Sequence, residues 1–164
     1  MRLKARIVAV FLVATTLSWT APANAVPGAR IRMAKIFYDS SGPDTGSNNS
    51  INNEYVILKN VSTVRGNLAG YTIRDQEGHA RTFGTRYLDP GQVVYLRSGK
   101  GTNTATTIYW GSDQYIWNNH GDTAYWSSPS GTLLQTCKWV RLTGLEVCAG
   151  TSKTTTRTPA AVPG

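Results

Sequence analysis

The chain has 164 residues, a formal net charge of +8, two cysteines and two histidines. This length suits one ordinary domain with short extensions. The positive residues do not form a dense block of Lys and Arg. The two cysteines and two histidines lack the paired spacing of a structural zinc site, so no such metal centre is expected.

An export signal is predicted over residues 1–25. Three positive residues precede an apolar run over residues 7–17, and Ala23, Asn24 and Ala25 supply the small-x-small pattern of a cleavage site. The run is shorter than the roughly 20 apolar residues that span a bilayer, although an uncleaved anchor stays the alternative. Cleavage after Ala25 removes three positive charges and no acid, which lowers the net charge from +8 to +5. The mature protein is expected to be secreted, with no membrane span.

The mature sequence consists of short segments rich in Val, Ile, Tyr and Trp, separated by Gly, Asn, Asp, Ser and Pro. This pattern favours an all-β sandwich or barrel, and no long stretch has helical periodicity. Strands are expected at residues 31–38, 54–60, 68–73, 79–83, 92–96, 115–117, 123–126 and 132–139. One domain is predicted over residues 26–149, followed by a disordered Thr/Pro-rich tail over residues 150–164.

The apolar pattern of the first predicted strand, residues 31–38, is irregular. Ile31 and Met33 share one face, whereas Ile36 has the opposite parity, so a β-bulge is expected near Ala34 and Lys35. Two turns are also predicted, one over residues 74–78 leading into a hairpin and one at Asp89-Pro90-Gly91.

The loop that follows the first strand is rich in oxygen ligands. Ca²⁺ takes six to eight of them, but the spaced D-x-D-x-D-G pattern is missing here. A plain polar loop is therefore preferred, no cofactor is expected, and calcium stays an alternative. The residues concerned are Asp39, Asp44, Asn48, Asn49, Asn52, Asn53 and Glu54.

Two cysteines remain after the predicted cleavage. An even pair in an exported protein predicts a disulfide between Cys137 and Cys148, 11 residues apart. A bridge that closes a loop of this size stabilises the fold by about 3 kcal/mol in the chain-entropy model.

Catalytic signatures are absent from the sequence, which has no nucleophile elbow, zinc-protease motif or phosphate-binding loop. His79 is expected to be a half-exposed strand residue. His120 and Asp122 could pair, yet no nucleophile or metal accompanies them, so Asp122 is expected to organise a turn through nearby backbone amides. The protein is predicted not to be an enzyme.

Aromatic residues are the strongest candidates for ligand contact, with core packing as the alternative. Strand alternation places Tyr125 and Trp126 on opposite faces, and Tyr109 and Trp110 likewise if that segment is extended, so some rings are expected at the surface. The candidates are Trp110, Tyr125 and Trp126. Basic residues that could help a polyanion bind are Arg30, Arg32, Arg74, Arg81 and Arg86.

The order of features along the chain resembles the lamin tail domain, in particular its short secreted versions in bacteria. The strongest piece is residues 116–124, in which a tryptophan–asparagine segment precedes Gly-Asp-Thr. The other pieces are residues 54–60, 68–75, 78–79, 83, 88–91 and 99–101. The resemblance implies an immunoglobulin-like β-sandwich in which Trp117, Gly121 and Asp122 are structural.

The resemblance also implies a non-enzymatic interaction module, since the family has no shared catalytic motif. The expected partner is a protein or a component of the cell envelope. Two alternatives stay open: a nucleic acid or other anionic polymer, whose binding would weaken steeply with salt, and a carbohydrate, which would contact Trp110 or Trp126.

Overall fold

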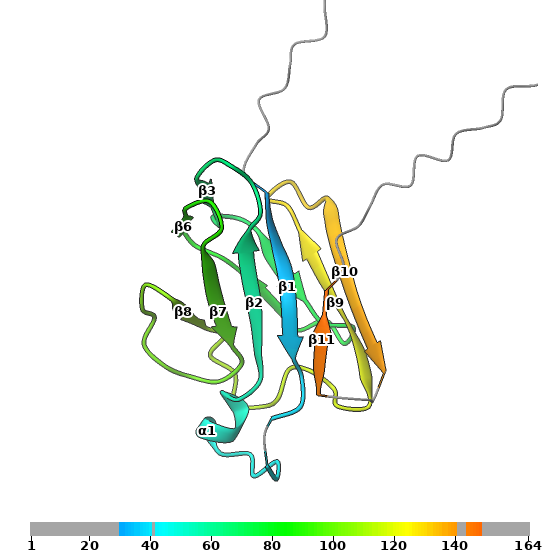
Figure 1. Ribbon diagram of the computed structural model, residues 1–164. Helices are drawn as coiled ribbons and strands as arrows, with labels where there is room; N and C mark the ends of the chain where they lie inside the picture. Colours follow the sequence, from blue (N-terminus) through cyan, green and yellow to red (C-terminus); the bar gives the residue numbers. More distant parts are fainter. Residues whose placement is uncertain (1–29, 41, 141–143, 149–164) are drawn as a thin grey trace, which may run out of the picture.

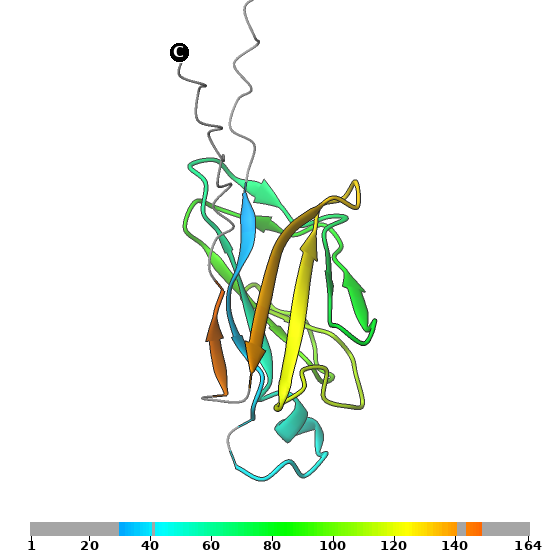
Figure 2. The same cartoon turned by 90° about the vertical axis from the view of Figure 1, so that its right-hand side faces the viewer.

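Alternating buried and exposed side chains along short strands produce two packed β-sheets. The computed structural model describes residues 30–40, 42–140 and 144–148. One sheet has five strands in the order β11-β1-β2-β7-β8, and the other has four in the order β10-β9-β4-β5. Figure 1 looks onto the five-stranded sheet, and Figure 2 shows the two layers from the side. The immunoglobulin-like β-sandwich expected from the sequence is confirmed.

The elements are short, and all but one are strands. They are β1 (Ile31–Phe37), α1 (Asn48–Ile51), β2 (Tyr55–Asn60), β3 (Gly66–Asn67), β4 (Thr72–Arg74), β5 (Ala80–Thr82), β6 (Tyr87–Leu88), β7 (Val93–Arg97), β8 (Thr107–Tyr109), β9 (Gly121–Ser127), β10 (Leu133–Val140) and β11 (Leu145–Val147). The pair β3–β6 forms a separate ribbon at one end of the sandwich, opposite the end that carries α1 (Figure 1).

The bulge predicted in the first strand is present. The register of β1 against β2 shifts between Met33 and Lys35, which lets Ile31, Met33 and Ile36 all point into the core. Gln135 of β10 binds the backbone at this point, because its side-chain amide accepts from Met33 N and donates to Met33 O, both at 2.9 Å. A buried amide from the second sheet thus satisfies both backbone groups of one residue in the first.

The core lies between the sheets and is dominated by aromatic rings. Trp117 makes edge-to-face contacts with Trp110 and Trp139 at centroid distances of 5.8 and 5.9 Å. Trp126 stacks on Tyr71 at 5.1 Å, and its indole N–H donates to Ile31 O at 2.8 Å. A buried indole N–H needs a hydrogen-bond acceptor. Here the acceptor belongs to β1, so the bond links the two sheets.

The disulfide joins β10 to the residue after β11. Cys137 and Cys148 are bonded, with Cα atoms 5.1 Å apart. The Cys148 N–H donates to Ala34 O at 3.0 Å, so the bridge fixes the final strand against β1 at the bulge.

Several details of the sequence interpretation need correction. Residues 115–117 are not a strand but a buried loop, because Ile116 N donates to the Glu54 carboxylate rather than to a neighbouring strand. Four short strands, β3, β6, β8 and β11, were not predicted. The signal at residues 1–25 and the tail at residues 150–164 lie outside the described residues.

Both turns behave as predicted. Residues 74–78 connect β4 to β5 in an antiparallel pair, and Gln92 N donates to Asp89 O across the turn at Gly91, whose φ is +77°. No helix in the described part of the chain is long and apolar enough to cross a membrane.

Candidate functional site

The outer face of the five-stranded sheet is the surface turned away from the second sheet. Along each strand its residues alternate with residues that point into the core. Figure 1 shows the backbone of this sheet from its outer side. We call this surface the outer face. It comprises Arg32, Lys35, Phe37, Tyr55, Ile57, Lys59, Val93, Tyr95, Arg97, Thr107, Tyr109, Leu145 and Val147.

Strand register arranges these side chains in three rows across the sheet. In each row the residues are Cα partners on adjacent strands. The first row, at the end nearest α1, is Leu145, Phe37, Tyr55, Arg97 and Tyr109. The second row is Val147, Lys35, Ile57, Tyr95 and Thr107, and the third is Arg32, Lys59 and Val93. Successive rows lie about 7 Å apart along the strands.

The aromatic rings of the outer face pack against one another. Phe37 and Tyr55 are stacked with centroids 4.3 Å apart and an angle of 22° between their planes, and Tyr95 lies 5.6 Å from Tyr55 at 59°. The first distance is close to the spacing of about 4.8 Å between neighbouring strands, so each ring stands over its own strand. The faces of Phe37 and Tyr55 therefore cover each other.

The outer face carries only positive charge. Its ionised side chains are Arg32, Lys35, Lys59 and Arg97. All nine acidic residues lie in the described part of the chain, and none of them is on this surface; Glu146 of β11 is opposite the buried Ile36 and so points the other way. The ion pairs between described residues do not include any of the four cations. An anion is the ligand that this charge distribution favours.

Arg97 and Tyr55 form a pair within the first row. The guanidinium carbon lies 5.4 Å from the centre of the Tyr55 ring, within the range of a cation–π contact. Burial raises the pKa of the Tyr55 hydroxyl, with the neighbouring Tyr95 adding to the rise and Arg97 opposing it. Tyr55 is protonated near neutral pH, as an ordinary tyrosine is, and can donate a hydrogen bond.

Sequence reasoning did not single out this surface. Arg32 was named only as a possible contact for a polyanion, and Tyr109 only as a ring that strand alternation could expose. The signal was present in the alternation of Tyr55, Ile57 and Lys59 with buried Val56 and Leu58.

The aromatic residues named from the sequence occupy other places. Trp126 is fully buried in the core, so the expectation that it contacts a ligand is wrong. Tyr125 is half-buried on the outer side of the four-stranded sheet, with the Arg74 guanidinium 4.4 Å from its ring centre. Trp110 is half-buried and packs on the core. These three rings do not form one surface.

The basic residues named from the sequence are also dispersed. Arg32 lies on the outer face, whereas Arg74 belongs to β4 in the opposite sheet. Arg81 donates to Trp110 O at 3.2 Å, and Arg86 donates to the backbone oxygens of Thr104 and Ala105. Arg30 is exposed just before β1.

Residues 117–122 surround a buried carboxylate. Asp122 accepts hydrogen bonds from the backbone N–H groups of Gln76, Asn118 and Thr123, so it organises the turn as expected. Gly121 has φ +134°, and a Cβ there would lie 3.2 Å from Trp139 O, a conformation and contact that favour glycine. Trp117 fills the core beside this turn.

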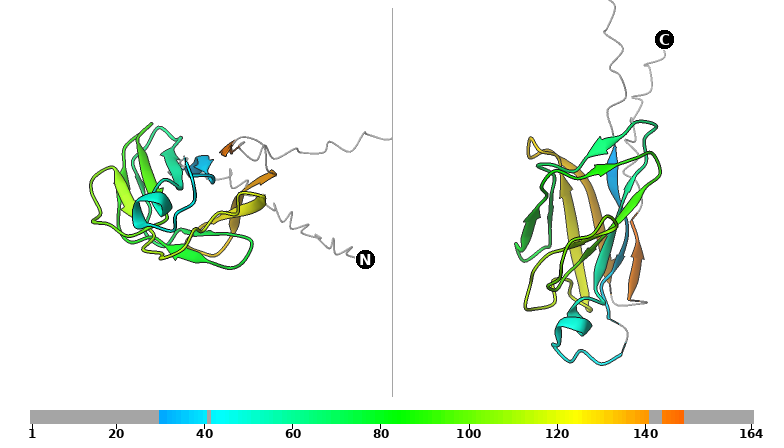
Figure 3. Two further views of the ribbon diagram at one scale, coloured as in Figure 1. Left: turned by 90° about the horizontal axis from the view of Figure 1, so that it is seen from below. Right: turned by 90° about the vertical axis from the view of Figure 1, so that its left-hand side faces the viewer.

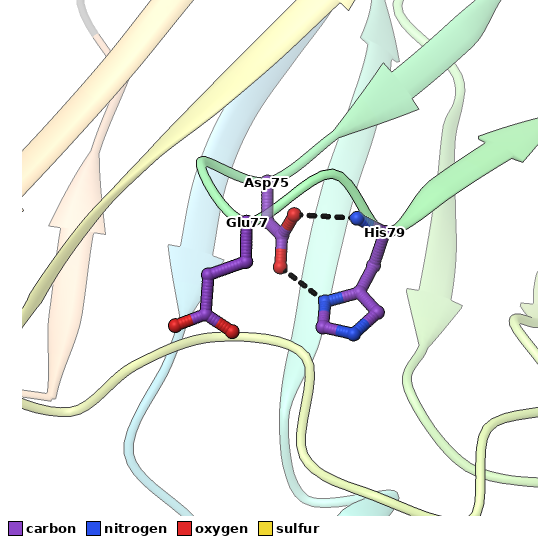
Figure 4. A group of neighbouring side chains, drawn as sticks. All are labelled: Asp75, Glu77 and His79. Atoms are coloured by element: carbon purple, nitrogen blue, oxygen red, sulfur yellow. Dashed lines mark hydrogen bonds and ion pairs between the residues drawn. The ribbon is translucent and has the colours of Figure 1, made fainter.

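A second carboxylate cluster closes the β4–β5 turn, as Figure 4 shows. Buried Asp75 accepts from the backbone N–H groups of Gly78 at 2.6 Å and His79 at 2.7 Å, and its other oxygen is 2.5 Å from His79 Nδ1. This bond raises the pKa of His79. Glu77 is close enough for the three side chains to offer ligand atoms within 4.8 Å of one another. The Asp75 carboxylate already has three hydrogen-bond partners within the protein, and these bonds stabilise the turn between β4 and β5.

Side chains of the oxygen-rich loop considered for calcium form hydrogen bonds with other groups of the protein. The Asn119 amide donates to Asp39 at 3.1 Å and to Asp44 at 3.0 Å. Asn48 and Asn52 both donate to Lys100 O, and Asn48 accepts from Lys100 N at 2.7 Å. The loop thus ties α1 to the segment after β7, and Figure 3 shows α1 and this loop from below and from the left-hand side.

Glu54 lies at the base of this loop. It is completely buried, and one carboxylate oxygen accepts from Ile116 N at 3.0 Å while the other has no hydrogen-bond partner among the described residues. Burial raises its pKa from 4.5 to about 8, against the opposing effect of the Ile116 N–H. A side chain of this kind is predominantly protonated at neutral pH.

Comparison with known proteins identifies a family. No curated protein matches the chain. The model of the Lamin Tail Domain matches residues 24–141, and the domain is a non-enzymatic, immunoglobulin-like module of binding and interaction. Since this match covers more than half of the chain, the protein belongs to the lamin tail domain family.

Proposed function

We propose that this protein is an exported, non-enzymatic binding module that contacts its partner outside the cell through the outer face. One observation carries the proposal: four aromatic residues and four cations share one sheet surface that no acidic residue enters. Rings and arginines are enriched where proteins bind partners. Export rests on the signal expected at residues 1–25.

The acidic groups that could serve in catalysis are held in structural roles, which supports binding rather than turnover. Asp75 accepts three hydrogen bonds from Gly78 and His79 of its own turn, and Asp122 accepts from its neighbours Asn118 and Thr123 and from Gln76 of the β4–β5 turn. Glu54 is buried beneath a loop. A general acid or base must reach the substrate proton, and these carboxyl groups are directed into the protein.

Capture from the producing cell tests the proposal. The exported protein, recovered intact with its disulfide, is used as bait for material from the cell envelope and the culture fluid. We expect Tyr95→Ala to lower the captured partner by about tenfold, as loss of a central interface ring commonly does. Tyr125→Ala is the matched control, because it removes a half-buried tyrosine from the outside of the other sheet.

Two results would refute the proposal. Equal loss of capture in Tyr95→Ala and Tyr125→Ala would show that the outer face is not the contact surface. Retention of the protein inside the cell with residues 1–25 uncleaved would refute the proposed export. Mass measurement of the recovered protein, expected to begin at Val26, checks the second point.

A further inference from the structure

The outer face combines features that together favour one class of ligand. We propose that it binds an acidic polysaccharide, a polymer whose sugar rings carry anionic groups separated by hydroxyls. This inference rests on the proposed function, since it names the partner of the same surface.

Charge is the first argument. Arg32 and Lys59 are direct cross-strand partners on the outer face. Like charges placed opposite each other in a sheet are destabilising, and no acidic residue lies on the surface to offset them. An anion bound between the two side chains would relieve this repulsion, so the pair is a site for a negative group of the ligand.

The distribution of the cations is the second argument. Arg97 is in the first row, Lys35 in the second, and Arg32 and Lys59 in the third, and the rows are about 7 Å apart. Duplex DNA carries one charge per roughly 1.7 Å of its axis and is usually contacted by an element that enters a groove. Sparse cations on a sheet instead match a polymer whose charges are one sugar ring or more apart.

The rings are the third argument. Binding of single-stranded nucleic acid depends on aromatic faces on which bases stack. Phe37 and Tyr55 cover each other's faces, and the Arg97 guanidinium lies over the Tyr55 ring. The edge of an aromatic ring carries the positive part of its quadrupole. Such edges attract anionic and hydroxyl oxygens and give no platform for bases.

Hydroxyl groups complete the surface. Tyr55 and Tyr95 lie side by side on β2 and β7, and Thr107 is the cross-strand partner of Tyr95 on β8. Each hydroxyl can donate and accept a hydrogen bond, which matches the hydroxyls along a sugar chain. Tyr55 is in its protonated, donating form near neutral pH, as an ordinary tyrosine is. The first and second rows thus supply hydroxyl groups beside the cations Arg97 and Lys35.

Titration with defined polymers tests the inference. Polygalacturonate is the probe, neutral dextran is the uncharged control, and a 20-base-pair duplex and a 20-nucleotide oligothymidylate represent nucleic acids. We expect the exported protein to bind polygalacturonate at low salt more tightly than any of the other three polymers. The affinity should decrease with rising salt, because part of it is electrostatic.

Variants locate the binding. We expect Lys35→Gln and Lys59→Gln each to weaken polygalacturonate binding on the order of threefold to tenfold. Lys138→Gln is the matched control, because it removes the same charge from an exposed strand residue of the other sheet, and it should change affinity less than about twofold. Tyr95→Phe should weaken binding while it leaves the ring in place.

Each remaining outcome overturns the inference. Equal effects of Lys59→Gln and Lys138→Gln would show attraction to net charge alone. Tighter binding to either nucleic acid would assign the outer face to that class. Binding to none of the polymers, with capture of a protease-sensitive partner that Tyr95→Ala still abolishes, would refute the polysaccharide and leave the proposed function intact.

Discussion

Arg32 on β1 and Lys59 on β2 are direct cross-strand partners, so two positive side chains lie opposite each other on the outer face. A fold selected only for stability would place an acid or a neutral residue at one of these positions. Replacing Lys59 by an acid should therefore raise the stability of the fold and weaken the binding of an anionic ligand.

Lys59→Glu should stabilise the protein and impair binding. A Glu opposite Arg32 replaces repulsion with attraction, and we expect the free energy of unfolding to rise by about 0.5 kcal/mol. Urea denaturation at low salt measures this change, and added salt should reduce it. Polygalacturonate binding should fall further than in Lys59→Gln. Lys138→Glu, at an exposed position of β10, is the control; equal stabilisation there would mean that the cross-strand pair is not the cause.

The sequence could predict the class of fold because its signals are local. The parity of Ile31, Met33 and Ile36 within one strand required a bulge, and Asp89-Pro90-Gly91 specified a turn from adjacent residues. Strands of two or three residues, such as β3 and β8, were missed because their pairing depends on partners distant in the chain rather than on a pattern of their own.

The outer face could not be predicted for the same reason. Tyr55 and Tyr95 are 40 residues apart, and they meet only because β2 and β7 pair in one particular register. Phe37 joins them through the register of β1, which the bulge sets. The sequence interpretation selected Trp110, Tyr125 and Trp126 instead, and Trp126 is fully buried, with its indole N–H bonded across the core to Ile31 O.

The Asp75–His79 pair should give the fold a measurable pH dependence. The bond to Asp75 raises the pKa of His79 above its ordinary value of 6.5. The folded state therefore holds the proton more strongly than the unfolded chain does. This contribution is complete below about pH 6.5 and is lost as the pH rises through the folded-state pKa.

Comparison of wild type with His79→Ala checks this. The difference in free energy of unfolding should be larger at pH 6 than at pH 9, and it should stay below about 1 kcal/mol because the imidazole is half-exposed. Asp75→Asn keeps an oxygen for the backbone amides of Gly78 and His79 but loses the charge. In that background His79→Ala should have a smaller pH-dependent effect; an unchanged effect would contradict the assignment to this pair.

Removal of the disulfide should loosen the edge of the outer face. Cys137→Ser with Cys148→Ser should lower the free energy of unfolding by about 3 kcal/mol, as expected for a loop of 11 residues. Because Cys148 follows β11, amide hydrogen exchange should increase first over residues 145–148. Exchange at β9, which pairs with β4 in the other sheet, is the internal control, and equal protection of β11 in both forms would contradict this role.

Glu54→Gln should stabilise the protein at neutral and alkaline pH. Burial raises the pKa of Glu54 from 4.5 to about 8, so between these values the folded state retains a proton that the unfolded chain has released. Stability consequently falls as the pH rises across that window, by several kcal/mol at most for a shift of this size. Gln has the same shape, carries no charge, can still accept from Ile116 N, and adds an N–H₂ group at the carboxylate oxygen that lacks a partner.

Melting temperatures of wild type and Glu54→Gln at pH 5, 6.5 and 8 test this directly. The advantage of the variant should be smallest at pH 5 and largest at pH 8. Glu146→Gln is the control, because it removes a half-exposed acid from β11 and should produce no comparable trend. A constant difference between Glu54→Gln and wild type at all three pH values would show that the carboxyl group is not protonated in the folded protein. A melting temperature of Glu54→Gln below that of wild type at pH 8 would show that the charge of Glu54 is stabilised by contacts with the surrounding loop.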